Sequence, residues 1–237
     1  MGSKKVNNEH EVTVRFRMIR NCMFLSGLSV FAQLYLFQPM LSDLCRSFSI
    51  TPAESSLAVS ASTVGMAVGL LFLAFKADGI SREKLMGASL ILSSVLTIAS
   101  AFIDSYSFLL VFNLLKGIVL AGVSAVALAY LSEEVDSSKI GLAISLYLSG
   151  NTLGGMSGRV AATLVSGYGG WQLATLVIGI VSLALGTIFC WKIPAGRNFS
   201  ASMVSFGEKM RQMRSLLTQT TFISMYVIAA LSMGIFV

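Results

Sequence analysis

Charged residues are scarce in this sequence. They make up 12% of its 237 residues, and 55% are hydrophobic, whereas a soluble domain carries roughly 25% charged residues. The deficit is concentrated in stretches without Asp, Glu, Lys or Arg, which run 21–42, 55–75, 85–103, 140–158, 160–191 and 215–237. About 20 apolar residues in a helix cross the hydrocarbon core of a bilayer, and only a helix or a closed barrel satisfies the backbone there. The composition therefore excludes an ordinary soluble domain and predicts an all-α membrane protein.

Histidine and cysteine are also scarce. The single histidine is His10, and the three cysteines, Cys22, Cys45 and Cys190, do not have the spacing of metal ligands. The sequence has no phosphate-binding glycine loop followed by Lys-Ser or Lys-Thr, no Ser/His/Asp constellation and no intramembrane carboxylate pair. We therefore expect neither an enzyme nor a metal site, an ATP-driven pump or a bound cofactor. No cleavable signal peptide is visible near the start, so the first apolar stretch is expected to be retained.

The apolar stretches predict six complete membrane spans and the start of a seventh. The predicted spans cover about 20–43, 55–76, 85–103, 106–131, 139–165, 171–191 and 219–237. We accordingly divide the chain into a polar tail (1–20), a six-helix bundle (21–191), a basic central loop (192–218) and a seventh span that has only begun (219–237). Because the chain stops inside an apolar run, we expect a truncated reading frame, a fragment or an interrupted gene.

The central loop is the only long connection. Its residues Met203, Phe206, Met210 and Met213 recur at helical spacing, with basic residues nearby. This pattern fits a short amphipathic helix on an anionic membrane surface. An unstructured linker fits the same residues equally well.

The positive charges predict the orientation of the spans. An N-terminus in the cytoplasm places fourteen lysines and arginines inside and two, Arg46 and Arg159, outside. Cytoplasmic loops of membrane proteins carry such an excess. The net charge of +6 is therefore an orientation signal, and nucleic-acid binding is not expected.

Small residues line one face of the fifth span. Gly150, Gly154 and Gly158 recur every fourth residue, and Gly155 stands beside them. A face of small residues allows the backbone of a neighbouring helix to approach closely. Tight packing against another span is the expected role.

The connection between the second and third spans resembles a loop motif of the major facilitator superfamily, G-x-L-x-D-R-x-G-R-R. The segment is AFKADGISREKLM, residues 74–86, with Asp78 and Arg82 at the Asp and the second Arg of the motif. Gly79 replaces the first Arg. The spacing and the position between these two spans support the match more than the individual residues do.

Two further segments resemble the same family. Residues 112–135 are similar to the fourth-helix motif R-x-x-Q-G, with Asn113 at the Arg, Lys116 at the Gln and Gly117 at the Gly. Residues 145–159 resemble the glycine-rich fifth-helix motif of the antiporter branch.

The resemblance implies a fold of two six-helix bundles, each made of inverted three-helix repeats, with this chain holding the first bundle. It implies proton-coupled efflux or exchange of a small organic solute in a bacterial inner membrane. The implied partners are the lipid bilayer, the solute, protons, and a missing C-terminal bundle or a partner chain. In this family the first and fourth spans face the central cavity, and the second and fifth do so in part. Candidates for solute contact are therefore Gln33, Phe37, Gln38, Asn113, Lys116 and Asn151.

Several roles stay open. A cation in mid-span costs at least about 2.5–3.5 kcal/mol unless it faces water, a partner or the bundle interior. Lys116 therefore either faces the cavity and attracts anionic groups or is a structural lysine bonded to carbonyl groups or to Asn113. The family motif adds flexing, or a seal against protons, to the packing role of the glycines. Asp78 is expected to cap the third span, and the resemblance implies that Asp78 and Arg82 also take part in gating between the bundles.

Two functions follow from the sequence. One is secondary transport, and the other is a transport-incompetent fragment or half-bundle that needs a partner. The first span lacks the acidic residue found in several drug–proton antiporters, which leaves the coupling ion open.

Overall fold

The computed structural model describes residues 2–196, 210–211, 215 and 218–236. The chain forms two units, Met1–Ser200 and Ala201–Val237. Every element in the described residues is helical, as the sequence predicts. In the first unit these are α1 (Gly2–Leu34), η1 (Gln38–Met40), α2 (Leu41–Phe48), α3 (Pro52–Lys76), η2 (Ala77–Gly79), α4 (Arg82–Ser100), α5 (Tyr106–Glu134) and α6 (Ile140–Lys192). The second unit contains α8 (Thr220–Phe236).

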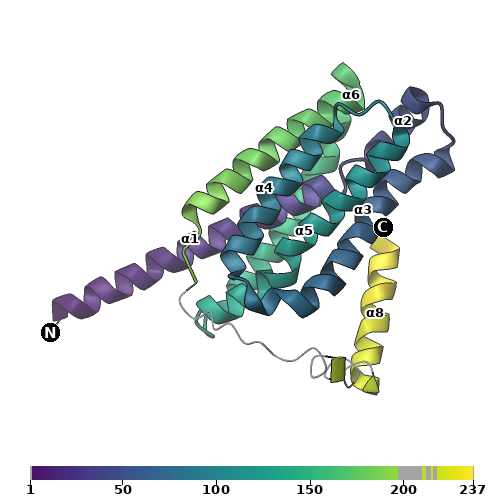
Figure 1. The fold of residues 1–237 in the computed structure, drawn as a ribbon. Coiled ribbons are helices and arrows are strands. Elements are labelled where there is room, and N and C mark those ends of the chain that lie inside the picture. The colour runs from purple at the N-terminus through teal and green to yellow at the C-terminus, as the bar shows by residue number, and fades with distance from the viewer. Residues whose placement is uncertain (1, 197–209, 212–214, 216–217, 237) are drawn as a thin grey trace. The chain divides into compact units, whose positions relative to one another are not determined.

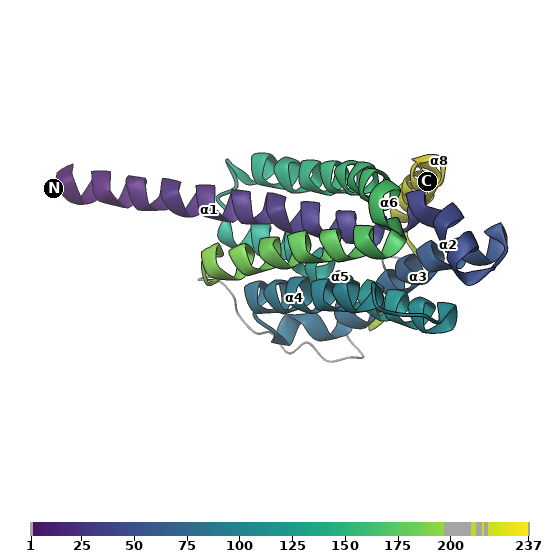
Figure 2. The same cartoon turned by 90° about the horizontal axis from the view of Figure 1, so that it is seen from above.

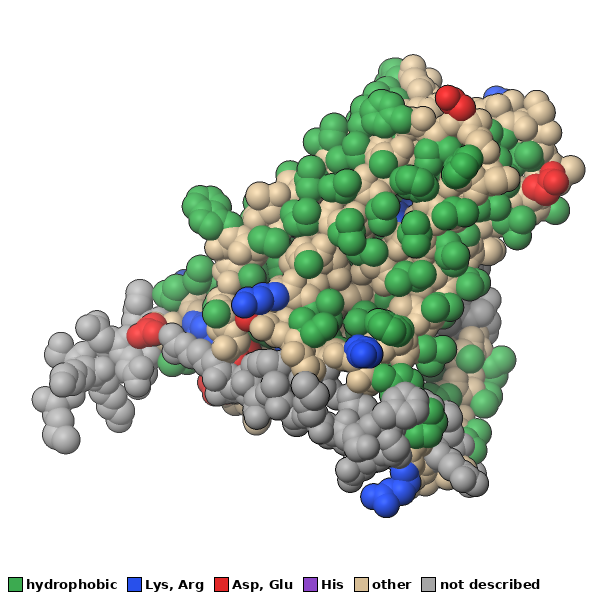
Figure 3. All heavy atoms as spheres, in the orientation of Figure 1, with side chains coloured by type: hydrophobic (Ala, Val, Ile, Leu, Met, Phe, Trp, Pro, Cys, Tyr) green, Lys and Arg blue, Asp and Glu red, His purple; other side chains and the backbone are tan. Residues whose placement is uncertain are grey.

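The helices of the first unit are long and apolar enough to cross a membrane. Five helical stretches meet that criterion among the described residues, and α6, at 53 residues, is long enough for two crossings. Figure 1 shows these helices lying alongside one another, with the N-terminal part of α1 extending beyond them. On the face shown in Figure 3, hydrophobic side chains cover the middle of the helices and most visible charged ones lie toward their ends. This distribution matches what a bilayer requires.

A glycine pair divides α6. Gly169 has φ −147° and ψ 23°, and Gly170 has φ 73° and ψ −176°, so neither is helical. A positive φ is accessible to glycine at little cost. The break lies between the predicted fifth and sixth spans, and it turns α6 into a first half (140–168) and a second half (171–192). In the view of Figure 2, α1 lies between the two halves.

The first span differs most from its predicted bounds. The polar tail and the apolar stretch form one continuous helix, α1, which ends at Leu34 instead of near residue 43. The backbone then bonds Gln38 N–H to the Tyr35 carbonyl and Met40 N–H to the Phe37 carbonyl, at 3.1 Å each. These are 3₁₀-type turns, and Pro39 fits their first positions because it needs no N–H donor there. Of the amphipathic pattern predicted for the central loop, most lies outside the described residues.

A capping box fixes the start of α3. The Thr51 hydroxyl accepts from Glu54 N–H at 3.2 Å, and Thr51 N–H donates to the Glu54 carboxylate at 2.8 Å. Pro52 occupies the first turn, where its missing N–H costs nothing.

The pairing of helices has an internal symmetry. Contacts pair α1 with α6, α3 with α5, and α4 with both α5 and α6. Glycines of the first half of α6 meet α1 in parallel, and Gly65 and Gly69 of α3 meet α5 in parallel. Gly179 and Gly186 of the second half of α6 meet α4 in antiparallel order. If span one is exchanged with span four, two with five and three with six, the contact of α1 with the first half of α6 becomes the contact of α5 with α3. The contact of α4 with the second half of α6 maps onto itself. This is the pattern of an inverted three-helix repeat.

Candidate functional site

The centre of the candidate site is a buried lysine on α5. Lys116 is 1% exposed, and its Nζ donates to Asn113 Oδ1 at 2.7 Å. The same Nζ lies 4.9 Å from the centre of the Phe37 ring, which supplies a cation–π contact. Three of the predicted solute-contact residues are thus brought together. The bond to Asn113 is the contact expected of a structural lysine, and both roles of Lys116 stay predictions.

Polar groups without partners surround this cluster. The Nδ2 of Asn113 is buried and has no hydrogen-bond partner among the described residues. The Phe37 ring contacts Trp171, at 6.3 Å between ring centres, and the buried Nε1 of Trp171 also lacks a partner there. The next residue after Phe37 is Gln38, whose buried Oε1 likewise has no hydrogen-bond partner among the described residues. Most buried polar atoms in proteins are bonded, so this concentration of unused donors and acceptors is unusual.

A second cation lies against the same segment of the chain. The Arg159 guanidinium of α6 is 4.6 Å from the centre of the Tyr35 ring, and Gly155 leaves room for that ring. The Nε of Arg159 is buried without a hydrogen-bond partner in the described part of the chain. Sequence reasoning counted Arg159 only as a charge near the outer surface. The sequence does indicate an intramembrane cation here, because Arg159 separates two long charge-free stretches.

Gln33 is buried among side chains of its own bundle. Its Nε2 donates to the Ser29 carbonyl and lies equally close, at 3.2 Å, to the Ser29 hydroxyl. Its Oε1 accepts from the Thr97 hydroxyl of α4 at 2.9 Å. These bonds place Gln33 between α1 and α4. A role in solute contact stays a prediction.

The glycines of the fifth-span motif face α1. A methyl group built on Gly150, Gly154 or Gly158 would overlap the backbone of α1, next to Phe24, Leu28 and Ala32 respectively. From the other side, Gly27 of α1 leaves space for the Asn151 side chain. Asn151 is half-buried and lies at this helix–helix contact. Close backbone packing is thus present along three turns, and the flexing role stays a prediction.

Arg82 of the loop motif joins η2, the start of α4 and the end of α5. Arg82 Nη1 donates to the Ala77 carbonyl at 2.8 Å, and Arg82 Nη2 pairs with Glu133 at 3.3 Å. Arg82 is buried, and its bonds join the η2 turn to the end of α5. Asp78 lies within η2, and its capping and gating roles stay predictions.

A second set of contacts, named here the Arg15 clasp, lies at the same end of α5. It comprises Arg15, Tyr130, Glu134, Pro194 and Ala195. Arg15 pairs with Glu134 and also donates to the Ala195 carbonyl at 2.8 Å, while the Tyr130 hydroxyl donates to the Pro194 carbonyl at 2.8 Å. These bonds tie together α1, α5 and the end of α6. The sequence shows an acidic stretch here but not its basic partners.

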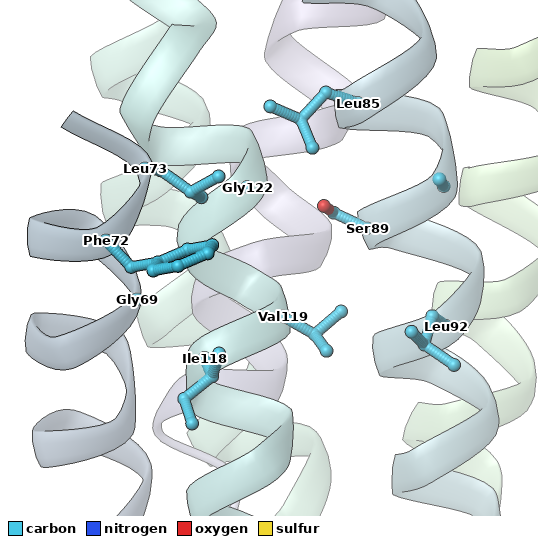
Figure 4. Close-up of a pocket in the computed structure, with 10 residues that line it drawn as sticks. Gly69, Phe72, Leu73, Leu85, Ser89, Leu92, Ile118, Val119 and Gly122 are labelled. Carbon is cyan, nitrogen blue, oxygen red and sulfur yellow. The ribbon is translucent and has the colours of Figure 1, made fainter. Parts of the chain in front are cut away.

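A separate cavity in the bundle is apolar. It has a volume of about 270 Å³ and lies between α3, α4 and α5, as Figure 4 shows. Phe72, Leu85, Leu92 and Ile118 are among its lining side chains, and Ser89 is its one hydroxyl. None of the predicted solute-contact residues lines it. Its chemistry suits an acyl chain better than a polar solute, so we place the candidate site at Lys116.

The comparisons with known proteins agree on one family. The family model of the Major Facilitator Superfamily matches residues 23–237. The chain is 35% identical over 219 residues to the uncharacterized MFS-type transporter YybF of Bacillus subtilis, covering 92% of this chain and 54% of that protein. It is 40% identical over 188 residues to the inner membrane transport protein YnfM of Escherichia coli, covering 79% and 45%.

A more distant relative has a named solute. The chain is 31% identical over 144 residues to the niacin transporter NiaP of Acinetobacter baylyi, covering 61% of this chain and 33% of that protein. The chain spans about half the length of YybF and of YnfM.

Proposed function

Because this chain belongs to the major facilitator superfamily, we propose that it forms the N-terminal half of a secondary transporter, which moves a small organic solute across a bacterial inner membrane. Its fold is the six-helix N-terminal bundle of that family, followed by α8. The chain is a multi-pass membrane protein.

The observation that carries the proposal is the polar cluster of Phe37, Asn113 and Lys116. An ionisable residue inside a membrane span is costly and usually serves a solute or ion pathway. Lys116 has one hydrogen bond, to the neutral amide of Asn113, and one contact with the Phe37 ring. The membrane span that contains it has no acidic residue. That arrangement stabilises the lysine and leaves donors next to it unused.

Several finer points belong to the same proposal. Proton coupling and the direction, efflux or exchange, rest on the resemblance of the motifs. The inner-membrane location rests on the relative YnfM, and the cytoplasmic N-terminus rests on the distribution of lysine and arginine.

Reconstitution of the whole chain tests the proposal. Proteoliposomes that enclose a pH-sensitive dye receive glucose, ethidium or benzoate in separate experiments, and proton flux is recorded. The chain is tested alone and together with the C-terminal half of YnfM expressed as a separate polypeptide. Because neutral benzoic acid crosses lipid unaided, only solute-dependent flux above that of protein-free liposomes supports transport, and such flux only in the second preparation shows that the half-bundle needs a partner.

The alternative is a transport-incompetent fragment. Absence of flux with every solute in both preparations, from protein that elutes as a folded species, would favour it over the proposed transport.

A further inference from the structure

Two intramembrane cations contact one short segment of the chain. Lys116 of α5 lies over Phe37, and Arg159 of α6 lies over Tyr35, only two residues earlier. Lys116 is ten residues from the start of α5 at Tyr106, and Arg159 is ten residues before the α6 break at Gly169. At about 1.5 Å per residue, both are roughly 15 Å from the same end of the bundle. The two positive charges therefore lie at similar depth.

Neither cation has an acidic partner. In the part of the chain that the structure describes, Arg15 and Arg82 each pair with a glutamate, whereas neither Lys116 nor Arg159 pairs with a carboxylate. Lys116 bonds a neutral amide, and Arg159 has a buried Nε without a hydrogen-bond partner. The aromatic rings offset only part of the cost of burying these charges. A carboxylate would compensate them much more fully.

The groups around the cations fit an anion with an organic body. The unused Nδ2 of Asn113 and Nε1 of Trp171 are hydrogen-bond donors, which a carboxylate accepts from. Phe37 and Trp171 supply apolar ring surface next to the ammonium group. We propose that the site around Lys116, with Arg159 as a second cation, binds a small organic carboxylate.

This inference rests on the proposed function and narrows its solute class. In the structure, Phe37 covers the ammonium group of Lys116, and Asn113 accepts a hydrogen bond from it. A bound carboxylate would replace Asn113 as the acceptor from Lys116 Nζ. The freed Asn113 side chain can then donate through Nδ2 to the same carboxylate.

Trp171 provides a direct readout of binding. The chain has two tryptophans, and Trp171 is buried against Phe37 whereas Trp191 is 85% exposed. In the Trp191→Phe variant, fluorescence excited at long wavelength reports Trp171 alone. The whole chain in detergent is titrated with benzoate and, in parallel, with the neutral isostere benzamide. We expect a saturable change with benzoate and at least tenfold weaker binding of benzamide.

Substitutions of the two cations test whether they are responsible for benzoate binding. Lys116→Gln keeps a polar group and removes the charge, so benzoate affinity should fall at least tenfold, and Arg159→Gln should weaken it less. Lys139→Gln is the matched control, because Lys139 also lies over a ring, 5.5 Å from the centre of Phe16, away from the site. Arg159→Lys serves where the glutamine variant does not fold, and it should retain most of the affinity.

The outcomes separate this inference from transport itself. Equal affinity for benzoate and benzamide, or unchanged benzoate affinity in Lys116→Gln, would overturn the carboxylate site. Charge-dependent binding without solute flux in proteoliposomes would support the site and count against transport by this chain. Flux of glucose or ethidium without benzoate binding would support transport and contradict the carboxylate class.

Discussion

Gly154 of α6 lies directly against Leu28 of α1, with so little space that a methyl group built on the glycine would be 2.6 Å from the Leu28 Cα. The contact is repeated one turn away in each direction, at Gly150 and Gly158. Helices in a membrane associate largely through van der Waals packing and hydrogen bonds, so a close backbone contact of this length supplies much of the α1–α6 attraction.

Substituting Gly154 by Ala should therefore destabilise the bundle. The backbone of α1 cannot move away at one turn without loosening the other two, and overpacking of this kind typically costs about 1–3 kcal/mol. Thermal unfolding of the purified chain in detergent measures the effect. Gly141→Ala is the control, because nothing lies within 4 Å of a methyl group there. Equal unfolding temperatures of the two variants would contradict the packing role.

Arg15→Ala should also lower stability, through the Arg15 clasp. The Glu134 side chain is 2% exposed and that of Arg15 is 18% exposed, so the substitution removes a cationic partner from a buried carboxylate. Loss of a partner by a buried polar group costs about 1–3 kcal/mol. A double-mutant cycle with Glu134→Gln isolates the coupling between the two side chains. Arg17→Ala is the control and should have little effect, because Arg17 is exposed and lies two residues further along α1. Additive effects of the Arg15 and Glu134 variants on the unfolding free energy would argue against the Arg15 clasp.

The predicted orientation can be checked by chemical labelling. In a variant without the native cysteines, Tyr168→Cys places a thiol at a position that is 91% exposed beside the α6 break. Ser137→Cys places one in the exposed connection between α5 and α6. A membrane-impermeant maleimide should label the first in intact cells and the second only after permeabilisation. The opposite pattern would mean that the N-terminus is outside.

Gln33 offers a test between packing and solute contact. The Thr97 hydroxyl lies 2.9 Å from Gln33 Oε1 and 2.8 Å from the Ser93 carbonyl, so its proton is shared between two acceptors. Thr97→Val removes the donor and should cost about 0.6 kcal/mol and at most about 1.7 kcal/mol, the range for interhelical hydrogen bonds in membranes. Thr187→Val is the control, because the exposed Thr187 hydroxyl bonds only within its own helix, to Leu183. If thermal unfolding does not distinguish the two variants, Gln33 is not held by α4 in the way proposed.

Most of the helices could be predicted from the sequence because a bilayer leaves the backbone few alternatives. The predicted second to sixth spans agree with α3, α4, α5 and the two halves of α6 to within a few residues. The first span is predicted to run to about residue 43, whereas α1 ends at Leu34 and 3₁₀ turns follow at Tyr35–Met40, because the apolar stretch continues past the end of the helix. Hydropathy predicts a helical backbone in lipid, but it does not distinguish α-helical turns from 3₁₀ turns.

The candidate site was less accessible to sequence reasoning. The short-range pair Lys116 and Asn113 could be anticipated, since residues one helical turn apart share a face. The contact of Arg159 with Tyr35 and the pair of Arg15 with Glu134 join residues far apart in the chain. Such partners depend on which helices pack together, and single-sequence periodicity does not determine that.

The parallel contact of α1 with the first half of α6 has a consequence for biosynthesis. Gly154 follows Leu28 by 126 residues, and ribosomes add about 5–20 residues per second. By this estimate α1 enters the membrane roughly 6–25 s before its glycine-lined partner has been synthesised. During that interval its inner face, with Gln33 and Ser29, must be covered by lipid, by earlier helices or by the insertion machinery. Assembly of the bundle is thus set by the order of translation, with the first helix among the last to reach its final contacts.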